Sequence, residues 1–396
     1  MTLLRFAGAL VMLLAGTALP LWATAAPRVP ADEGELVETL PARPLGSLET
    51  RRARTDSAQR PRDEALALRS AEALLASARA EGDARYAGQA LGALQAWEPL
   101  SSATPVPILV MHATVAQFLH DFDGAEATLK TALAKDRTHA QGWITLATIL
   151  RVRGRYAESD AACNGVARAG QAFYAIACLA ENAGLRGDHA GATKTLRTLL
   201  DNPVARGAAQ GGTRQWLWTS IAEVEELAGR PDAAEQAYRE ALAAERSGYA
   251  LLAYADFLLG RARAREVEAL LRNQPRSDAV LLRLAIAARR AAPADTKAAS
   301  RADADELRSR FEAAALRPGS GAAHAREQSL FALDVQGDPG SALQLARGNV
   351  ALQREPIDLL LFARAAAAAK DEAARREVAA LVRQMGLRDA RIDTLL

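Results

Sequence analysis

The sequence predicts an all-α fold built from about nine stacked helix-turn-helix units. Two observations lead to this prediction: a composition that favours helices and a motif that recurs about every 34 residues. Half of the 396 residues are hydrophobic, and only 5% are aromatic. Alanine and leucine dominate the apolar residues and form helices well, whereas the aromatic and β-branched residues that strands prefer are scarce.

The recurring motif places large and small residues at fixed positions. Three anchor pairs are about 34 residues apart, namely Phe122 and Tyr156, Ala125 and Ser159, and Leu129 and Cys163. Further copies begin at Gly187 and Gly229, and an insertion from Asn202 to Arg214 separates these two copies. This period is typical of a repeat made of two helices and a turn.

One unit carries the motif in its most complete form, Trp143-x2-Leu146-Ala147-x2-Leu150-x3-Gly154-Arg155-Tyr156-x2-Ser159. The pattern resembles that of the tetratricopeptide repeat family, in which large apolar, small, glycine and aromatic residues follow in this order. The resemblance implies a right-handed superhelix of stacked helix pairs. The pairs must stack on their neighbours, because one helix pair alone leaves an apolar face in water. It also implies that the glycine ends the first helix in a left-handed cap.

The repeats divide the chain into segments. We expect a signal peptide in residues 1–25, a flexible leader in 26–62, a repeat superhelix in 63–316, a hinge in 317–323, and a C-terminal helical block with a cap in 324–396. Residues 387–396 are the expected polar cap, which the ends of stacked repeats require. Two arrangements stay open at the hinge: a separate C-terminal block, or continuous stacking across it.

The N-terminal residues indicate export. Arg5 precedes an apolar run from Phe6 to Leu14, and small residues end the segment at Ala25. This order is typical of a secretory signal peptide cleaved after Ala25. The alternative, a membrane anchor, needs about 20 uninterrupted apolar residues, and Pro20 falls inside the stretch. We therefore expect an exported protein, periplasmic or secreted, with no integral membrane segment after cleavage.

The chain has two cysteines, Cys163 and Cys178. The resemblance places Cys163 on a second helix and Cys178 on the first helix of the next unit, and these helices touch in such repeats. A disulfide is the favoured interpretation for an exported protein. The alternative is a pair of buried thiols at alanine-like sites.

Charge and motifs argue against several functions. The formal net charge of +2 comes from interspersed acidic and basic residues, so no basic stripe indicates a nucleic-acid partner. The five histidines lack the spacing of metal ligands, and no glycine-rich phosphate loop is present. Gly319-Ser320-Gly321 lacks the wider frame of a nucleophile elbow. We expect no metal, no cofactor and no enzymatic activity.

The resemblance also assigns residues to the concave side of the superhelix. The predicted partner-binding groove contains Gln117, Phe118, Arg151, Tyr174, Glu181, Trp216, Glu223, Glu226 and Tyr254. Aromatic and acidic side chains suit an extended or helical peptide that carries basic and apolar residues. The alternative is that the aromatic residues pack between repeats. Trp143 is assigned to the core.

The favoured function is a non-catalytic scaffold of the cell envelope that binds a protein or peptide partner in this groove. One alternative is an enzyme whose helical superhelix guides a cell-wall or envelope glycan to a catalytic carboxylate. Another is an accessory subunit that is stable only in a complex. A fold of this class hosts many functions, so the fold alone does not separate these hypotheses.

Overall fold

The computed structural model describes residues 55, 60, 62–207, 210–291, 297–315 and 324–396. These residues belong to one compact unit, Gly46–Leu396, and they form helices and turns without a strand. The predicted signal peptide, most of the predicted leader and the hinge at 317–323 lie outside the described residues.

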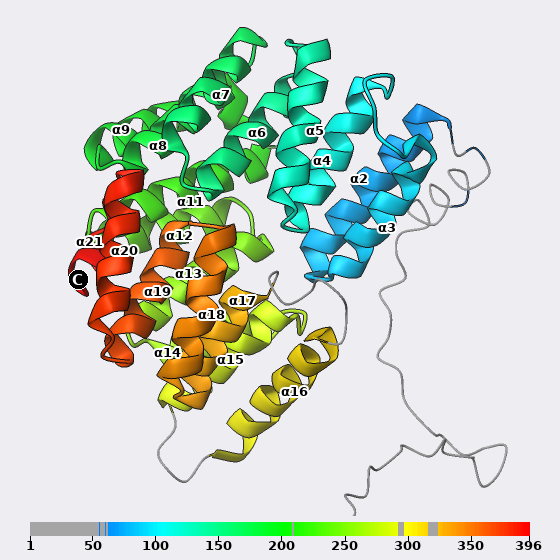
Figure 1. Cartoon of the computed structure of the whole chain (residues 1–396). Helices are drawn as coiled ribbons and strands as arrows, with labels where there is room; N and C mark the ends of the chain where they lie inside the picture. Colours follow the sequence, from blue (N-terminus) through cyan, green and yellow to red (C-terminus); the bar gives the residue numbers. More distant parts are fainter. Residues whose placement is uncertain (1–54, 56–59, 61, 208–209, 292–296, 316–323) are drawn as a thin grey trace, which may run out of the picture. The chain divides into compact units, whose positions relative to one another are not determined.

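Helices follow one another along the whole described chain, from α2 in blue to α21 in red (Figure 1). The elements are α2 (Glu64–Glu81), α3 (Ala84–Leu94), η1 (Gln95–Trp97), α4 (Val106–Phe118), α5 (Phe122–Lys135), α6 (Ala140–Val152), α7 (Tyr156–Arg168), α8 (Ala172–Leu185), α9 (His189–Leu200), α10 (Pro203–Arg206), α11 (Gly211–Leu227), α12 (Pro231–Ala244), α13 (Gly248–Gly260), α14 (Ala264–Leu271), α15 (Asp278–Ala291), α16 (Lys297–Ala315), α17 (Ala325–Leu330), the π-helical turn η3 (Phe331–Gln336), α18 (Pro339–Leu352), α19 (Pro356–Ala368), α20 (Glu372–Met385) and α21 (Ala390–Asp393).

The helices pack as consecutive pairs. Nine pairs are described: α2–α3, α4–α5, α6–α7, α8–α9, α11–α12, α13–α14, α15–α16, α17–α18 and α19–α20. Neighbouring pairs also touch, and α15 contacts both α17 and η3. The architecture is therefore an all-α superhelical repeat of the tetratricopeptide-like kind, and stacking continues beyond α16. The predicted insertion at Asn202–Arg214 contains the short helix α10.

Local residues determine where the helices begin and end. Five second helices begin at an aspartate whose carboxylate accepts a backbone N–H of the first turn: Asp83, Asp121, Asp188, Asp338 and Asp371. Such a cap stabilises a helix by about 1 kcal/mol. The glycine predicted to end the first helix has a positive φ in successive pairs, +73° at Gly154, +101° at Gly187 and +68° at Gly229.

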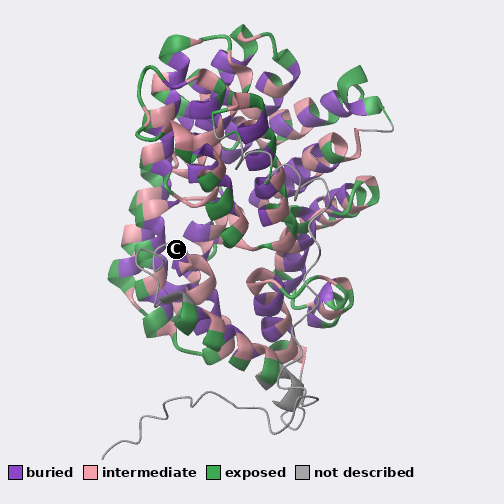
Figure 2. Ribbon diagram, turned by 90° about the vertical axis from the view of Figure 1, so that its right-hand side faces the viewer, coloured by how far each residue is buried: buried purple, intermediate pink, exposed green. Residues whose placement is uncertain are grey.

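The core lies between the paired helices, where Figure 2 shows buried residues in purple. The small residues of successive first helices are almost fully buried, with exposures of 0% at Ala113, 1% at Ala147, 6% at Ala180 and 0% at Ala222. A larger side chain at these places would separate the helices, because protein interiors are close-packed. The aromatic residues at the turn, Phe122 and Tyr156, are each only 3% exposed.

Trp143 was predicted to lie in the core, but the structure places it at the edge of the core. Its ring is half-buried and lies against Gly165 of α7, where any side chain would clash with it. The indole N–H donates to the carbonyl of Arg137 at 2.9 Å, and the guanidinium of Arg168 lies 5.9 Å from the ring centroid. Trp143 belongs to the first turn of α6, so it covers the edge of the α6–α7 interface rather than its centre.

The C-terminal segment returns to the middle of the chain and crosses three successive turns. Gly154, Gly187 and Gly229 face Met385, Arg388 and Ala390 respectively. The backbone N–H of Arg388 donates to the carbonyl of Leu185 at 2.9 Å, and Figure 1 shows α21 beside α11, a contact confirmed by their packing.

This segment was predicted to be a polar cap, but it also carries core residues. Leu387 is 1% exposed and Ile392 is fully buried. The physical reason is that the segment packs against neighbouring helices: α21 contacts α11 and α19, and both side chains belong to the large hydrophobic core cluster. The last residues therefore connect three repeats.

Exchange of a turn glycine tests this contact. A Cβ on Gly187 would lie 2.9 Å from Cγ of Arg388, whereas nothing lies within 4 Å of a Cβ on Gly170, whose φ is also positive at +82°. We expect Gly170→Ala to lower the free energy of unfolding by about 1–2 kcal/mol through backbone strain. Gly187→Ala should lower it by about 1–3 kcal/mol more, because Arg388 must move. Urea unfolding measures both variants, and equal losses would contradict the contact.

Candidate functional site

A pocket of 580 Å³ lies on one side of α6, α8 and α11. This groove pocket is lined by Ala140, Gln141, Ile144, Thr148, Arg151, Gln171, Tyr174, Cys178, Glu181 and Trp216. On α6 and on α8 the central lining residues follow the spacing i, i+4, i+7, which places them on one helix face. Equivalent faces of successive first helices therefore line the same side. Four predicted groove residues meet here: Arg151, Tyr174, Glu181 and Trp216.

Two aromatic rings form one wall of the groove pocket. Tyr174 and Trp216 stack with their centroids 6.1 Å apart and their planes 27° from parallel. Both rings are half-buried against the core, and Phe173 contacts Tyr174 edge-on at 5.2 Å. The indole N–H of Trp216 donates to Oε1 of Glu181 at 3.0 Å, which fixes the ring. The wall presents apolar area from side chains already held in place.

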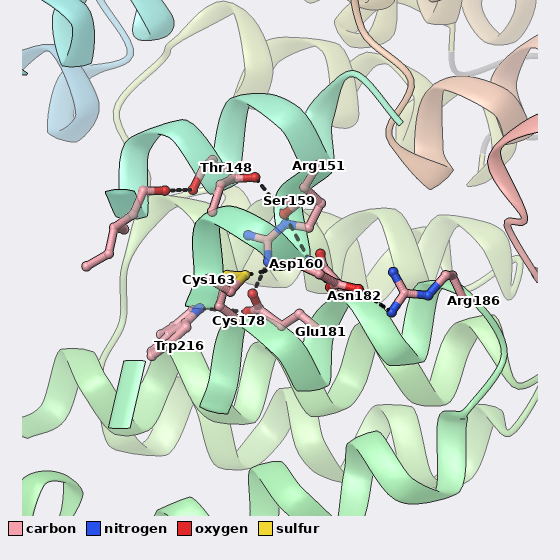
Figure 3. Close-up of a disulfide and its surroundings, with 12 residues drawn as sticks. Thr148, Arg151, Ser159, Asp160, Cys163, Cys178, Glu181, Asn182, Arg186 and Trp216 are labelled. Atoms are coloured by element: carbon pink, nitrogen blue, oxygen red, sulfur yellow. Dashed lines mark hydrogen bonds and ion pairs between the residues drawn. A yellow bond between two sulfur atoms is a disulfide. The ribbon is translucent and has the colours of Figure 1, made fainter. Parts of the chain in front are cut away.

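Glu181 connects the three helices of the groove pocket, as Figure 3 shows. Besides Trp216, its Oε1 accepts the hydroxyl of Ser220 at 2.6 Å, and its Oε2 pairs with the guanidinium of Arg151. Burial lowers the pKa of Arg151, but the attraction of Glu181 outweighs it and raises the pKa above the usual range. The paired guanidinium and carboxylate are held in place by each other and can act as fixed polar contacts for a ligand.

A disulfide joins Cys163 of α7 to Cys178 of α8, with the two Cα atoms 5.8 Å apart (Figure 3). Asn182, one turn after Cys178, donates to Oγ of Ser159 and to Oδ1 of Asp160, at 2.9 Å each. The hydroxyl of Ser159 in turn donates to the carbonyl of Ala147 at 2.9 Å. Cys178 also lines the groove pocket. The disulfide and these hydrogen bonds therefore hold the pocket's floor on α8 against α6 and α7.

Glu223 continues the inner face of α11, seven residues after Trp216. Its Oε1 accepts the hydroxyl of Tyr249 at 2.6 Å. Burial raises the pKa of Glu223, the hydrogen bond from Tyr249 lowers it, and repulsion by Glu181, Glu226 and Glu355 raises it further, so that the pKa is about 7. Tyr249 was not predicted as a groove residue. Tyr249 lies near the start of α13, which is the first helix of its pair. This position within the repeat is the sequence signal that could have identified it as a groove residue.

Glu226 and Tyr254 lie away from the groove pocket. The carboxylate of Glu226 accepts the hydroxyl of Tyr238 at 2.7 Å and lies 2.9 Å from the guanidinium of Arg391 in α21. Tyr254 is 8% exposed, and its ring packs 6.1 Å from Phe257 and 5.6 Å from Tyr238. The C-terminal segment covers Glu226, and Tyr254 packs between repeats, as the alternative interpretation of the aromatic residues had it.

Gln117 and Phe118 are also outside the groove pocket. Phe118 packs against the core between α2, α3 and α4, and Gln117 is half-buried beside it on α4. Both residues belong to the last turn of α4, and no residue of α4 lines the pocket, whose walls come from α6, α8 and α11.

The C-terminal helices contribute charged groups that sequence reasoning missed. Arg326 of α17 lies 2.6 Å from Oδ1 of Asp358 and 2.5 Å from Oε2 of Glu355. Burial raises the pKa of Glu355, but the charges of Arg326 and Arg151 outweigh it and lower the pKa. Arg151 of α6 and Glu355 thus influence each other although they are far apart in the sequence. No local sequence pattern predicts that these two residues lie near enough to influence each other.

The described part of the chain contains no candidate metal cluster and no candidate membrane-spanning helix. No group of three or more histidine, cysteine, aspartate or glutamate residues there is arranged to hold a metal ion. None of the described helices has the length and apolar character needed to cross a bilayer.

No protein-family model matches the sequence, and no curated protein matches it. The solved structures that are similar to it include the following three. A tetratricopeptide repeat protein from Parabacteroides merdae is 17% identical over 66% of this chain and 98% of its own, with a TM-score of 0.37. A chain of Naa15/Naa10 bound to HypK-THB is 15% identical over 81% of this chain and 63% of its own, with a TM-score of 0.26. Yeast Tom70 is 10% identical over 87% of this chain and 88% of its own, with a TM-score of 0.26.

Removal of the disulfide tests its contribution to the site. The bond closes a loop of 15 residues, so Cys163→Ala combined with Cys178→Ala should lower the free energy of unfolding by about 3 kcal/mol. A reductant should lower the stability of the wild type to that of the double variant and leave the double variant unchanged. Denaturant unfolding and thiol titration of the purified, non-reduced protein are the measurements. Two reactive thiols in the non-reduced, denatured protein would contradict the bond.

Proposed function

We propose that this chain is a non-catalytic interaction scaffold that binds an extended or helical segment of a protein partner in the groove pocket. The observation that carries the proposal is the fixed aromatic wall of Tyr174 and Trp216 beside the ion pair of Arg151 and Glu181. Buried aromatic anchors and arginines supply most of the affinity at protein interfaces. The groove pocket brings these residue types together.

The rigidity of the pocket supports binding rather than packing alone. Binding a partner costs free energy when side chains must be ordered, and side chains ordered beforehand reduce this cost. Trp216 is held by its hydrogen bond to Glu181, which is held by Arg151 and Ser220. The pocket is therefore formed before a partner arrives.

The proposed location is the cell envelope or the exterior of the cell. The predicted signal peptide in residues 1–25 supports export, and the disulfide suits an oxidising compartment. A protein partner in that compartment would be exposed to the same oxidising conditions.

One observation favours a second candidate function, an enzyme or accessory subunit that acts on envelope glycan. A carboxyl whose pKa is near 7, as at Glu223, can act as a general acid. Incubation of the mature chain with purified cell-wall glycan would decide between the two. Release of soluble fragments that Glu223→Gln abolishes would favour the enzyme, and the scaffold predicts no release.

Two tryptophans of α11 allow a matched test of the scaffold. Trp216 lines the groove pocket, whereas the half-buried Trp218 does not, and its ring lies 5.3 Å from Arg197 of α9. Peptides selected from a random library on the mature chain should bind Trp216→Ala more weakly by about 2 kcal/mol, or about 30-fold. Their dissociation constant for Trp218→Ala should match that of the wild type.

Trp216→Phe keeps a ring but removes the N–H that binds Glu181, so it should give a smaller loss than Trp216→Ala. Thermal unfolding checks that each variant is folded. Equal affinity for Trp216→Ala and the wild type, or equal weakening by Trp218→Ala, would place the binding surface elsewhere.

A further inference from the structure

The arginines of α6, α17 and α21 are outnumbered by the carboxylates with which they pair. Three ion-pair groups are described: Arg151 with Glu181, Arg326 with Glu355 and Asp358, and Arg391 with Glu226 and Asp389. Two of the three arginines are thus shared between two carboxylates. Glu223 has no ion pair with a basic side chain in the part of the chain that the structure describes; its hydrogen bond comes from Tyr249.

Glu223 consequently faces an excess of negative charge. The charged and titratable groups that act on it come from several elements: Arg151 of α6, Glu181 of α8, Glu226 of α11, Tyr238 of α12, Tyr249 of α13 and Glu355 at the start of α19. Arg151 attracts Glu223 but is engaged by Glu181. A partly buried carboxylate in this setting is stabilised by a cation that comes from outside the chain.

Tyr249 supplies an aromatic ring beside this carboxylate. Its hydroxyl lies 2.6 Å from Oε1 of Glu223, yet the residue is 64% exposed, the highest value among the exposed large hydrophobic residues that the structure describes. A ring face attracts ammonium and guanidinium groups by about 0.5–2 kcal/mol. Carboxylate and ring together provide an ion pair and a cation–π contact for one ligand group.

Glu223 lies on the same face of α11 as Trp216, which lines the groove pocket. Trp216, Ser220 and Glu223 follow the spacing i, i+4, i+7 and share one face of the helix. Seven residues of helix span about 10 Å, and an extended peptide covers this length with about three residues. A peptide anchored at Trp216 would place a side chain about three residues away at Glu223.

We propose that Glu223 and Tyr249 form a subsite for one cationic side chain, lysine or arginine, of the segment bound in the groove pocket. This inference rests on the proposed function and adds its charge specificity: the carboxylate of Glu223 pairs with the cation, and the ring of Tyr249 covers it. Because an ionised Glu223 is required and its pKa is about 7, affinity for a cation should rise as the pH passes from about 6 to about 8.

The test uses two probes that differ in charge alone. N-acetyl-arginine amide carries the cation, and N-acetyl-citrulline amide is its neutral counterpart of nearly the same shape. In titrations of the mature chain followed by NMR, we expect saturable binding of the arginine probe at one site. The citrulline probe should bind at least about tenfold more weakly, because it forms no ion pair.

Glu223→Gln should reduce the affinity of the arginine probe to the citrulline level and remove the rise with pH. Glu240→Gln, which makes the same charge change on the exposed face of α12, is the matched control and should bind as the wild type does. Tyr249→Phe keeps the ring and should lose less affinity than Tyr249→Leu. Glutamine at position 223 can still accept the hydroxyl of Tyr249, so the fold should be preserved.

Equal affinity for both probes, or full affinity for the arginine probe in Glu223→Gln, would overturn the subsite. These results are distinguishable from a failure of the groove itself. Library-selected peptides that depend on Trp216 but not on Glu223 would retain the proposed function and reject the cation subsite.

Discussion

A single helix pair cannot bury both of its apolar faces, and this constraint determines the rest of the structure. Each pair gains its missing contacts from the next, so the pairs stack with a constant phase. The buried alanines Ala113, Ala147, Ala180 and Ala222 recur at the place where the helices approach most closely. With the phase fixed, outward-facing residues of successive first helices must also share a side. The groove pocket on α6, α8 and α11 is a consequence of this regularity.

Stacking alone does not account for the end of the chain. The C-terminal segment crosses the turns at Gly154, Gly187 and Gly229, and it takes Glu226 out of the groove through Arg391. Arg391 of this segment is shared between Glu226 and Asp389, and Arg326 of α17 is likewise shared between Glu355 and Asp358. Neither arginine pairs with Glu223, whose electrostatic setting therefore depends on how the C-terminal helices meet the repeats.

The helices and the sharing of one face by Arg151, Tyr174, Glu181 and Trp216 could be predicted from the sequence, because both follow from the repeat period. Trp143 and Tyr254 could not be assigned correctly from the period. Trp143 stands in the first turn of its helix and covers an edge. Tyr254 packs against Tyr238 of the preceding helix, α12, and against Phe257 one turn later in α13. Arg326 and Glu355 were missed because their approach to α6 depends on the path of the whole chain, and no spacing along the sequence encodes it.

The central claim is that equivalent faces of successive first helices form one binding surface. Hydroxyl-radical footprinting of the protein, alone and with a library-selected peptide bound, tests it most directly, because it reports the exposure of single side chains. The account predicts that the peptide protects Tyr174 and Trp216 from oxidation, while Trp143 and Trp218 react as before. Protection of Trp143 or Trp218 with unchanged oxidation of Tyr174 and Trp216 would contradict it.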